Sequence, residues 1–198
     1  MKIYTKKGDC GYSSLYDGKR IQKNNIIFDV LGEIDELTSR VGLLSCYVKN
    51  LLNDKIYDEL YNIQGLLQFI NSNIATIDVR KKEKIYKIND EDIYNIESLI
   101  DYMDNINGPL TKFILPGSAL ESSYCHLCRT QTRKVERYLW NLENSNEIVL
   151  SNQNSSELDL EEVHVDKNIL KYMNRLSDYF FSLARYICTI QNIDDRYI

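Results

Sequence analysis

The sequence predicts an all-α protein: a single-domain bundle of five helices, preceded by an ordered N-terminal arm. Three observations lead to this prediction. Only eight of the 198 residues are glycine and two are proline, which favours long helices over a turn-rich β fold. Apolar residues recur at helical spacing in five segments of the chain. A chain of this length supports one hydrophobic core and is short for two domains, so we treat residues 1–198 as one domain.

The arm is predicted over residues 1–24, which lack apolar periodicity and contain three closely spaced glycines. The first helix follows from Ile26, where apolar residues keep helical spacing as far as Val48. A second amphipathic helix is expected to begin at Asn53 or Asp54, because either side chain can cap a helix N-terminus.

The third helix is expected after a charged segment, residues 78–89, which we interpret as a loop. Asn89 or Asp90 can cap this helix. It should end at Asn107-Gly108-Pro109, because glycine accepts the terminal turn and proline cannot continue a helix.

The fourth and fifth helices are predicted over residues 118–142 and 167–191. Residues 143–166 lie between them and are rich in Asn, Ser and Glu, with no apolar period. This composition predicts a solvated, mobile excursion from the bundle.

Composition and charge exclude several classes of protein. The formal net charge of −5 argues against nucleic-acid binding, which usually needs a basic face. No apolar run approaches the roughly 20 residues that span a bilayer, and the N-terminus lacks signal or transit features, so we expect a cytoplasmic protein. Five scattered cysteines favour free thiols. Cys125 and Cys128 flank His126, but no second such pair completes a metal site, and we expect none.

The first candidate site is the arm sequence Thr5-Lys6-Lys7-Gly8-Asp9-Cys10-Gly11-Tyr12-Ser13-Ser14. Glycines let backbone N–H groups approach an anion, and the lysines and hydroxyls add charge and hydrogen-bond donors. The motif is neither a Walker loop nor a dinucleotide fingerprint. An ordinary solvated loop remains an alternative interpretation.

The second candidate site is a charged run on the predicted fourth helix. It consists of Arg129, Arg133, Lys134, Glu136 and Arg137. Most of these residues share one helix face, and four cations to one acid would suit a polyphosphate ligand. An exposed helix face with salt bridges explains the same pattern equally well.

Two smaller polar groups lie within otherwise core-like helices. Asp35 and Glu36 interrupt the apolar spacing of the first helix, where an acid could orient an arginine of the fourth. Asn174 and Asp178 are neighbours four residues apart on the fifth helix. Either group could also be structural.

Several motifs, taken in order along nearly the whole chain, resemble those of one known family. They are Lys2-Ile3-Tyr4-Thr5-Lys6-x-Gly8-Asp9-x-Gly11-x-Ser13-Ser14, Gly32-x-x-Asp35-Glu36-Leu37, Phe113-Ile114-Leu115-Pro116-Gly117, His126-x-x-Arg129-x-x-x-Arg133-x-x-Glu136-Arg137, Asn174-Arg175-Leu176-Ser177-Asp178 and Leu183-Ala184-Arg185-Tyr186. With these motifs the chain resembles the PduO-type ATP:corrinoid adenosyltransferases. The resemblance implies a five-helix bundle that forms a homotrimer, with ATP held between neighbouring subunits.

The resemblance also implies roles for the two charged motifs in binding ATP. The residues of the arm that would wrap the triphosphate are Thr5, Lys6, Lys7, Gly8, Ser13, Ser14 and Lys23. The residues of the fourth helix that would hold phosphates and nucleoside are Arg133, Lys134, Glu136 and Arg137. Asn174 would add a hydrogen bond from the fifth helix, and Mg²⁺ would accompany the nucleotide, held mainly by phosphates and water.

On the corrinoid side, the resemblance implies that Asp35 pairs with Arg129 and that Phe113 closes the lower face of cobalt. The reaction would transfer the 5′-deoxyadenosyl group of ATP to cob(I)alamin, giving adenosylcobalamin and triphosphate. Cob(I)alamin is itself a strong nucleophile, so no general base is required. The transition state would then depend on Arg133 and the other cations that stabilise the leaving triphosphate.

Rival interpretations and partners remain open from the residues alone. A protein that delivers adenosylcobalamin or senses ATP without turnover would need the same binding residues. An inert helical bundle that binds other proteins would need none of them. For the enzyme, a flavoprotein reductase and an adenosylcobalamin-dependent enzyme are expected protein partners.

Overall fold

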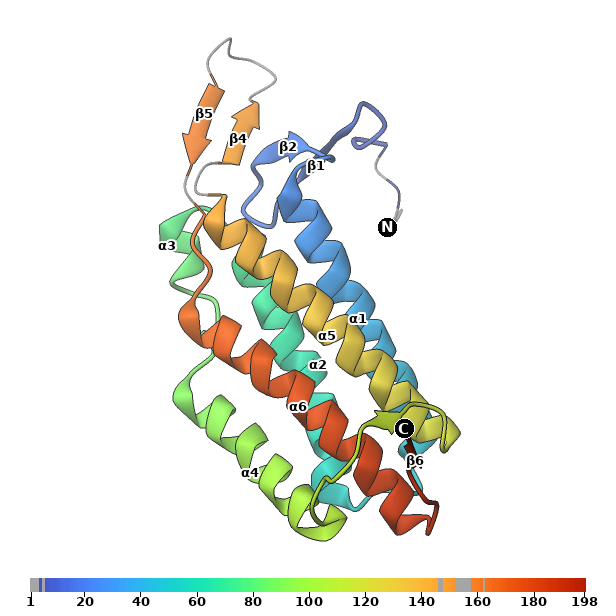
Figure 1. Ribbon diagram of the computed structural model, residues 1–198. Helices are drawn as coiled ribbons and strands as arrows, with labels where there is room; N and C mark the ends of the chain where they lie inside the picture. The colour runs from blue at the N-terminus through green and yellow to red at the C-terminus, as the bar shows by residue number, and fades with distance from the viewer. Residues whose placement is uncertain (1–3, 5, 146–147, 152–157, 162) are drawn as a thin grey trace.

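The computed structural model describes residues 4, 6–145, 148–151, 158–161 and 163–198, and it is mostly helical, as predicted (Figure 1). These residues contain five long helices and one short helix. They are α1 (Ile26–Val48), α2 (Asp54–Ile74), α3 (Val79–Lys82), α4 (Asp90–Asn107), α5 (Leu120–Asn144) and α6 (Lys167–Ile190).

The helices begin and end where local chemistry requires it. Asn53 caps α2 by accepting a hydrogen bond from the backbone N–H of Ile56, and Asn89 forms a capping box with Asp92 at the start of α4. Gly108 ends α4 with a positive φ of 70°. These boundaries confirm the predicted second and third helices.

The segment 78–89 was predicted to be a loop, and this is wrong for four of its residues. Asp78 caps the short helix α3 by accepting hydrogen bonds from the backbone N–H groups of Arg80 and Lys81. The cap stabilises a single turn that buries no residue. Apolar periodicity therefore gave no sign of this helix.

Three small antiparallel sheets correct the prediction of an all-α chain. In the arm, β1 (Tyr12–Ser14) pairs with β2 (Arg20–Gln22). The short strand β3 (Ile114–Leu115) pairs with β6 (Arg196–Tyr197) near the C-terminus. In the predicted excursion, β4 (Ile148–Ser151) pairs with β5 (Leu158–Glu161), so this segment is not without secondary structure. Residues 146–147, 152–157 and 162 of the excursion lie outside the described residues.

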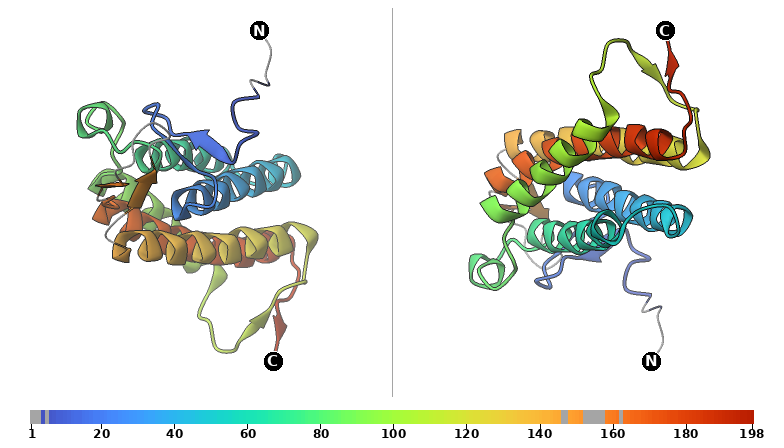
Figure 2. Two further views of the ribbon diagram at one scale, coloured as in Figure 1. Left: turned by 90° about the horizontal axis from the view of Figure 1, so that it is seen from above. Right: turned by 90° about the horizontal axis from the view of Figure 1, so that it is seen from below.

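The bundle has two sides. Helix α1 packs on α2 and α5, and α6 packs on α5 and α4. Both views in Figure 2 place the arm on the α1–α2 side and the C-terminal end of the chain on the α5–α6 side. None of the described helices is long and apolar enough to cross a membrane.

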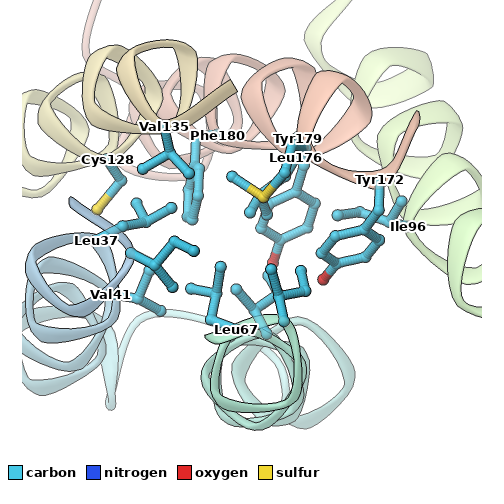
Figure 3. Packing of buried hydrophobic residues seen from close by; sticks show 14 of the residues in the cluster. Leu37, Val41, Leu67, Ile96, Cys128, Val135, Tyr172, Leu176, Tyr179 and Phe180 are labelled. Carbon is cyan, nitrogen blue, oxygen red and sulfur yellow. The ribbon is translucent and has the colours of Figure 1, made fainter. Parts of the chain in front are cut away.

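The core fills the space between these helices with aliphatic and aromatic side chains (Figure 3). Leu37, Leu67 and Phe180 are fully buried and come from three different helices. Tyr172 and Tyr179 on α6 are also fully buried, yet neither hydroxyl finds a hydrogen-bond partner among the described residues. A buried hydroxyl without a partner costs stability, because it has lost its hydrogen bonds to water.

Candidate active site: the arm, the arginine row and the Phe113 loop

The arm forms a small polar pocket at its hairpin. Its volume is about 200 Å³, and the residues that line it are Lys7, Gly8, Tyr12, Ser13, Ser14 and Arg20. The ammonium of Lys23 also lies here, because a Cβ added to Gly8 would be 3.1 Å from Lys23 Nζ. The structure therefore gathers five predicted arm residues, whereas Thr5 lies outside the described residues.

Hydrogen bonds hold the arm in this shape. Arg20 Nη2 donates to the carbonyl oxygen of Lys7 at 2.8 Å, and the N–H of Lys23 donates to the carbonyl oxygen of Gly11 at 2.9 Å. Gly11 has a φ of 80°, a conformation that favours glycine. Lys6 has a similarly positive φ of 59°.

Asp17 anchors the arm to the segment that joins α2 to α3. Its carboxylate accepts hydrogen bonds from the N–H groups of Ile77 and Asp78 at 2.9 and 3.0 Å. Burial opposes ionisation, but these bonds outweigh it and lower the pKa of Asp17. Sequence reasoning missed Asp17, although an Asp-Gly pair is a turn signal.

The second part of the site is the arginine row, by which we mean Arg129, Arg133 and Arg137 on α5. Arg133 and Arg137 are exposed, and among the described residues neither forms an ion pair. Burial, and then the charge of Arg133, lower the pKa of Arg129. The row is thus a cluster of cations that form no ion pair among the described residues, although the charge of Arg133 acts on the carboxyl of Asp178 and opposes the rise in its pKa that burial causes.

Arg129 is oriented by His126, one helical turn earlier. Arg129 Nε donates to His126 Nδ1 at 3.3 Å. Burial and the neighbouring Arg129 lower the pKa of His126 to about 4, so the imidazole is neutral and its Nδ1 accepts. The side chain of Cys128 is buried as well, and burial raises its pKa to about 12.

No group of three potential metal ligands occurs among the described residues.

Lys134 does not join the arginine row. Its ammonium lies 2.6 Å from Glu33 Oε1 on α1, and Gln131 Nε2 donates to Glu33 Oε2, also at 2.6 Å. Burial opposes ionisation of Glu33, but the hydrogen bonds from Lys134 and Gln131 outweigh it and lower its pKa. The contact joins α1 to α5, so the structure gives Lys134 a partner that the sequence analysis did not foresee.

The remaining predicted nucleotide ligands lie between α5 and α6. Asn174 Nδ2 donates to Glu136 Oε1 at 3.2 Å, and Arg175 Nη1 donates to Asn174 Oδ1 at 2.7 Å. These three residues, together with Trp140 and Lys171, contribute to an open pocket of about 390 Å³. The structure therefore brings Glu136 and Asn174 together through a direct hydrogen bond between α5 and α6.

The predicted pair of Asp35 and Arg129 does not form within the chain. Asp35 is exposed on α1, and no ion pair joins it to Arg129 among the described residues. Phe113 is 84% exposed on the loop before α5, a high value for a large apolar side chain. The side chains of Asp35 and Phe113 are therefore exposed on the surface of the single chain.

These observations define the class of protein: a helical bundle with a lysine- and glycine-bearing arm, a row of unpaired arginines and an exposed aromatic side chain on one loop. The particular family follows from comparison with known proteins. Residues 3–187 match the family model described as cobalamin adenosyltransferase. The chain belongs to this family.

Two relatives and one solved structure support the assignment. The chain is 36% identical to the corrinoid adenosyltransferase of Bos taurus, over 93% of this chain and 70% of that protein. It is 35% identical to the corrinoid adenosyltransferase of Bacillus subtilis, over 98% of this chain and 91% of that protein. A variant PduO-type ATP:corrinoid adenosyltransferase from Lactobacillus reuteri, complexed with cobalamin and ATP, superposes with a TM-score of 0.79. That match has 30% identity and covers 100% of this chain and 99% of the other.

Proposed function

We propose that the chain transfers the 5′-deoxyadenosyl group of ATP to the cobalt of cob(I)alamin. The bond between C5′ and the triphosphate oxygen breaks, a carbon–cobalt bond forms, and triphosphate leaves. The electron pair of the new bond comes from reduced cobalt, so the chain needs no general base. The observation that carries the proposal is the unpaired arginine row in a member of the cobalamin adenosyltransferase family.

In this proposal the triphosphate is bound by the arm and the arginine row together. The arm lies on the α1–α2 side of the bundle, whereas α5 and α6 form the other side (Figure 2). A ligand held by both elements therefore fits best between the arm of one subunit and the α5 helix of its neighbour. We extend this arrangement to a homotrimer of single-domain chains.

Individual roles follow from the contacts within the chain. Arg133 and Arg137, which form no ion pair among the described residues, stabilise the negative charge that develops on the leaving triphosphate. Glu136 and Asn174, already joined by a hydrogen bond, bind the nucleoside. Lys134 contributes to the nucleotide site only indirectly, because its ammonium forms an ion pair with Glu33.

The corrinoid side of the site consists of Phe113, Asp35 and Arg129. An exposed phenylalanine can cover the lower axial face of cobalt and exclude a ligand there, which makes cob(II)alamin easier to reduce. Asp35 and Arg129 lack an ion-pair partner within the described chain, so we assign their contact to a subunit interface. Mg²⁺ would be held by the ATP phosphates and water, which is its usual mode of binding.

A direct test measures product formation and ATP binding in matched arginine variants. Under strong reductant, the wild-type chain should convert ATP and cobalamin to adenosylcobalamin and triphosphate. Arg133→Ala should lower kcat/KM by about a hundredfold, the usual effect of removing one preorganised donor. The matched control is Arg80→Ala, because Arg80 is also exposed but lies on α3, and not on the helix that carries the row.

Two outcomes would contradict the proposal. Equal activity of the Arg133→Ala and Arg80→Ala variants would show that the arginine row does not act on the triphosphate. Tight binding of ATP and adenosylcobalamin without any product would instead indicate a delivery or sensor protein.

A further inference from the structure

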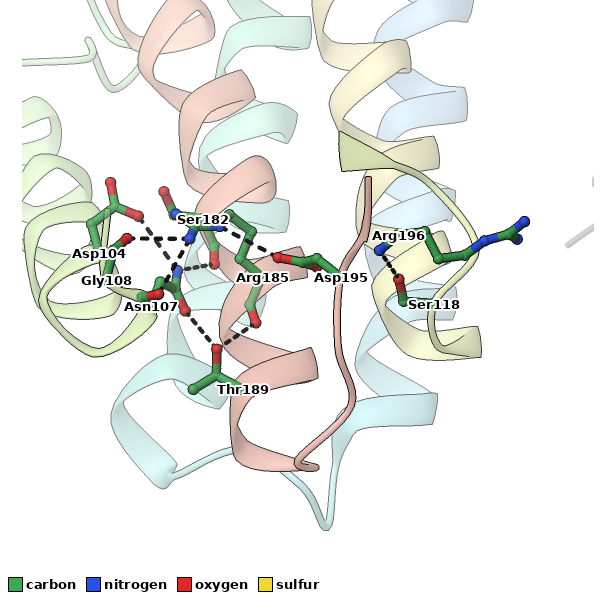
Figure 4. Close-up of polar contacts among 9 residues, drawn as sticks. All are labelled: Asp104, Asn107, Gly108, Ser118, Ser182, Arg185, Thr189, Asp195 and Arg196. Carbon is green, nitrogen blue, oxygen red and sulfur yellow. Dashed lines mark hydrogen bonds and ion pairs between the residues drawn. The ribbon is translucent and has the colours of Figure 1, made fainter. Parts of the chain in front are cut away.

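A buried arginine on α6 links the end of α4 to the C-terminal segment (Figure 4). Arg185 is 6% exposed, and its Nη2 donates to the carbonyl oxygens of Asn107 and Gly108, both at 3.2 Å. Its Nε lies 3.6 Å from Asp195 Oδ2, and both side chains of this ion pair are largely buried. Arg185 thus contacts the first residues of the loop that carries Phe113 and also the segment that follows α6.

The C-terminal segment, residues 193–198, contacts the rest of the same loop. Strand β6 pairs with β3, directly after Phe113. The N–H of Ile198 donates to the carbonyl oxygen of Phe113 at 3.1 Å, and the N–H of Arg196 donates to Ser118 Oγ at 3.0 Å. The loop is therefore held at its start by Arg185 and at its middle and end by the C-terminal segment.

These contacts matter because the Phe113 side chain has little else to fix it. The ring is 84% exposed, so packing against the bundle cannot determine its position. Its backbone carbonyl, by contrast, is fixed by Ile198. A buried ion pair such as Arg185–Asp195 adds little net stability, but it requires a defined geometry of both partners. The pair suits a role in positioning the C-terminal segment.

We propose that Arg185 and Asp195 are positioning residues for Phe113, and that they act through the C-terminal segment. The proposal rests on the proposed function, in which Phe113 excludes the lower axial ligand of cobalt. It assigns a role to the Leu183-Ala184-Arg185-Tyr186 motif, to which the nucleotide site gives none. It also predicts a specific defect: loss of the four-coordinate form of cob(II)alamin with ATP binding retained.

The main experiment compares two aspartate variants of the full-length protein. Asp195→Asn removes the charge opposite Arg185 with almost no change of shape. Asp194→Asn makes the same chemical change at the neighbouring exposed residue and serves as the control. The absorbance spectrum of cob(II)alamin with protein and ATP measures the four-coordinate fraction. Loss of one charge-assisted contact should lower the ratio of four- to five-coordinate cobalt by about tenfold in Asp195→Asn.

The ATP dissociation constant separates this role from general damage to the fold. It should be the same in wild type, Asp194→Asn and Asp195→Asn. A second variant, with residues 196–198 deleted, removes β6 but leaves the buried ion pair, and it should show the same spectral defect. Arg185→Lys should retain part of the wild-type four-coordinate signal, because lysine keeps the positive charge opposite Asp195.

The outcomes distinguish failure of this inference from failure of the proposed function. If Phe113→Ala abolishes the four-coordinate form but Asp195→Asn and the deletion do not, the positioning role is wrong. If Phe113→Ala itself leaves the spectrum unchanged, the proposed role of Phe113 is wrong, and the positioning role falls with it. A parallel loss of ATP binding in Asp195→Asn would also overturn the inference, because it would indicate general misfolding.

Discussion

Protonation of His126 should destabilise the folded chain as the pH falls from about 7 to about 4. The imidazole is only 5% exposed, and its Nδ1 accepts a hydrogen bond from Arg129. The ring centroid of Phe181 lies 6.2 Å from that of His126. A proton on Nδ1 would remove the acceptor and place a second cation beside the guanidinium, in surroundings that exclude water.

The pKa of His126 gives the size of the effect. Burial and Arg129 lower this pKa from 6.5 to about 4. The unfolded chain therefore takes up the proton at higher pH than the folded chain. Stability is unaffected above pH 6.5, falls as the pH drops below that value, and reaches its full loss near pH 4. The total loss is about 3 kcal/mol.

Urea denaturation across this pH range provides the assay, with His126→Gln as the test variant. Glutamine cannot take up the proton. Between pH 7 and pH 4, the unfolding free energy of the His126→Gln variant should therefore fall by about 3 kcal/mol less than that of wild type. His164→Gln is the control, because it makes the same substitution at the other histidine, whose side chain is 72% exposed. Equal pH dependence of wild type and His126→Gln, or an NMR titration of His126 near its ordinary pKa, would refute the reasoning.

Three further predictions concern the core, a helix terminus and the arm. Tyr179→Phe removes a buried hydroxyl that has no hydrogen-bond partner among the described residues, so it should raise the unfolding free energy by about 1 kcal/mol in urea denaturation; a loss instead would reveal a partner for the hydroxyl. Asn89→Ala removes the capping box of α4 and should lower thermal stability by about 1 kcal/mol, whereas unchanged melting would contradict the cap. Gly8→Ala brings a Cβ to 3.1 Å from Lys23 Nζ, so calorimetry should find weaker ATP binding at unchanged stability. Unaltered affinity would remove Gly8 from the site.

The five long helices could be predicted because their signals are local. Asn53 and Asn89 cap the helices that they precede, and Gly108 ends α4 within one turn of the apolar pattern. The small sheets could not be predicted in the same way. Strand β3 at Ile114–Leu115 pairs with β6 at Arg196–Tyr197, and two residues at such separation carry no periodic signal of their own.

The sequence indicated which residues belong to the site, but not which of them contact one another. A row of cations on one helix is visible in the sequence, yet Lys134 points to Glu33 because adjacent helical positions differ by about 100°. The neutral state of His126 depends on burial, which a single sequence does not give. For Asp35 and Arg129, the motif indicated a partnership but could not say whether it lies within a chain or between two chains.

The arginine row also sets a limit on how stable the free protein can become. The charge of Arg133 acts on the partly buried Arg129, and no ion pair among the described residues offsets the repulsion. Selection for heat resistance alone would therefore favour neutral side chains at these positions and discard the chemistry. The triphosphate of ATP can neutralise these cations, so the protein saturated with ATP should unfold more slowly on heating than the protein without nucleotide. Nucleotide supply would then govern how long each molecule survives, as well as how fast it works.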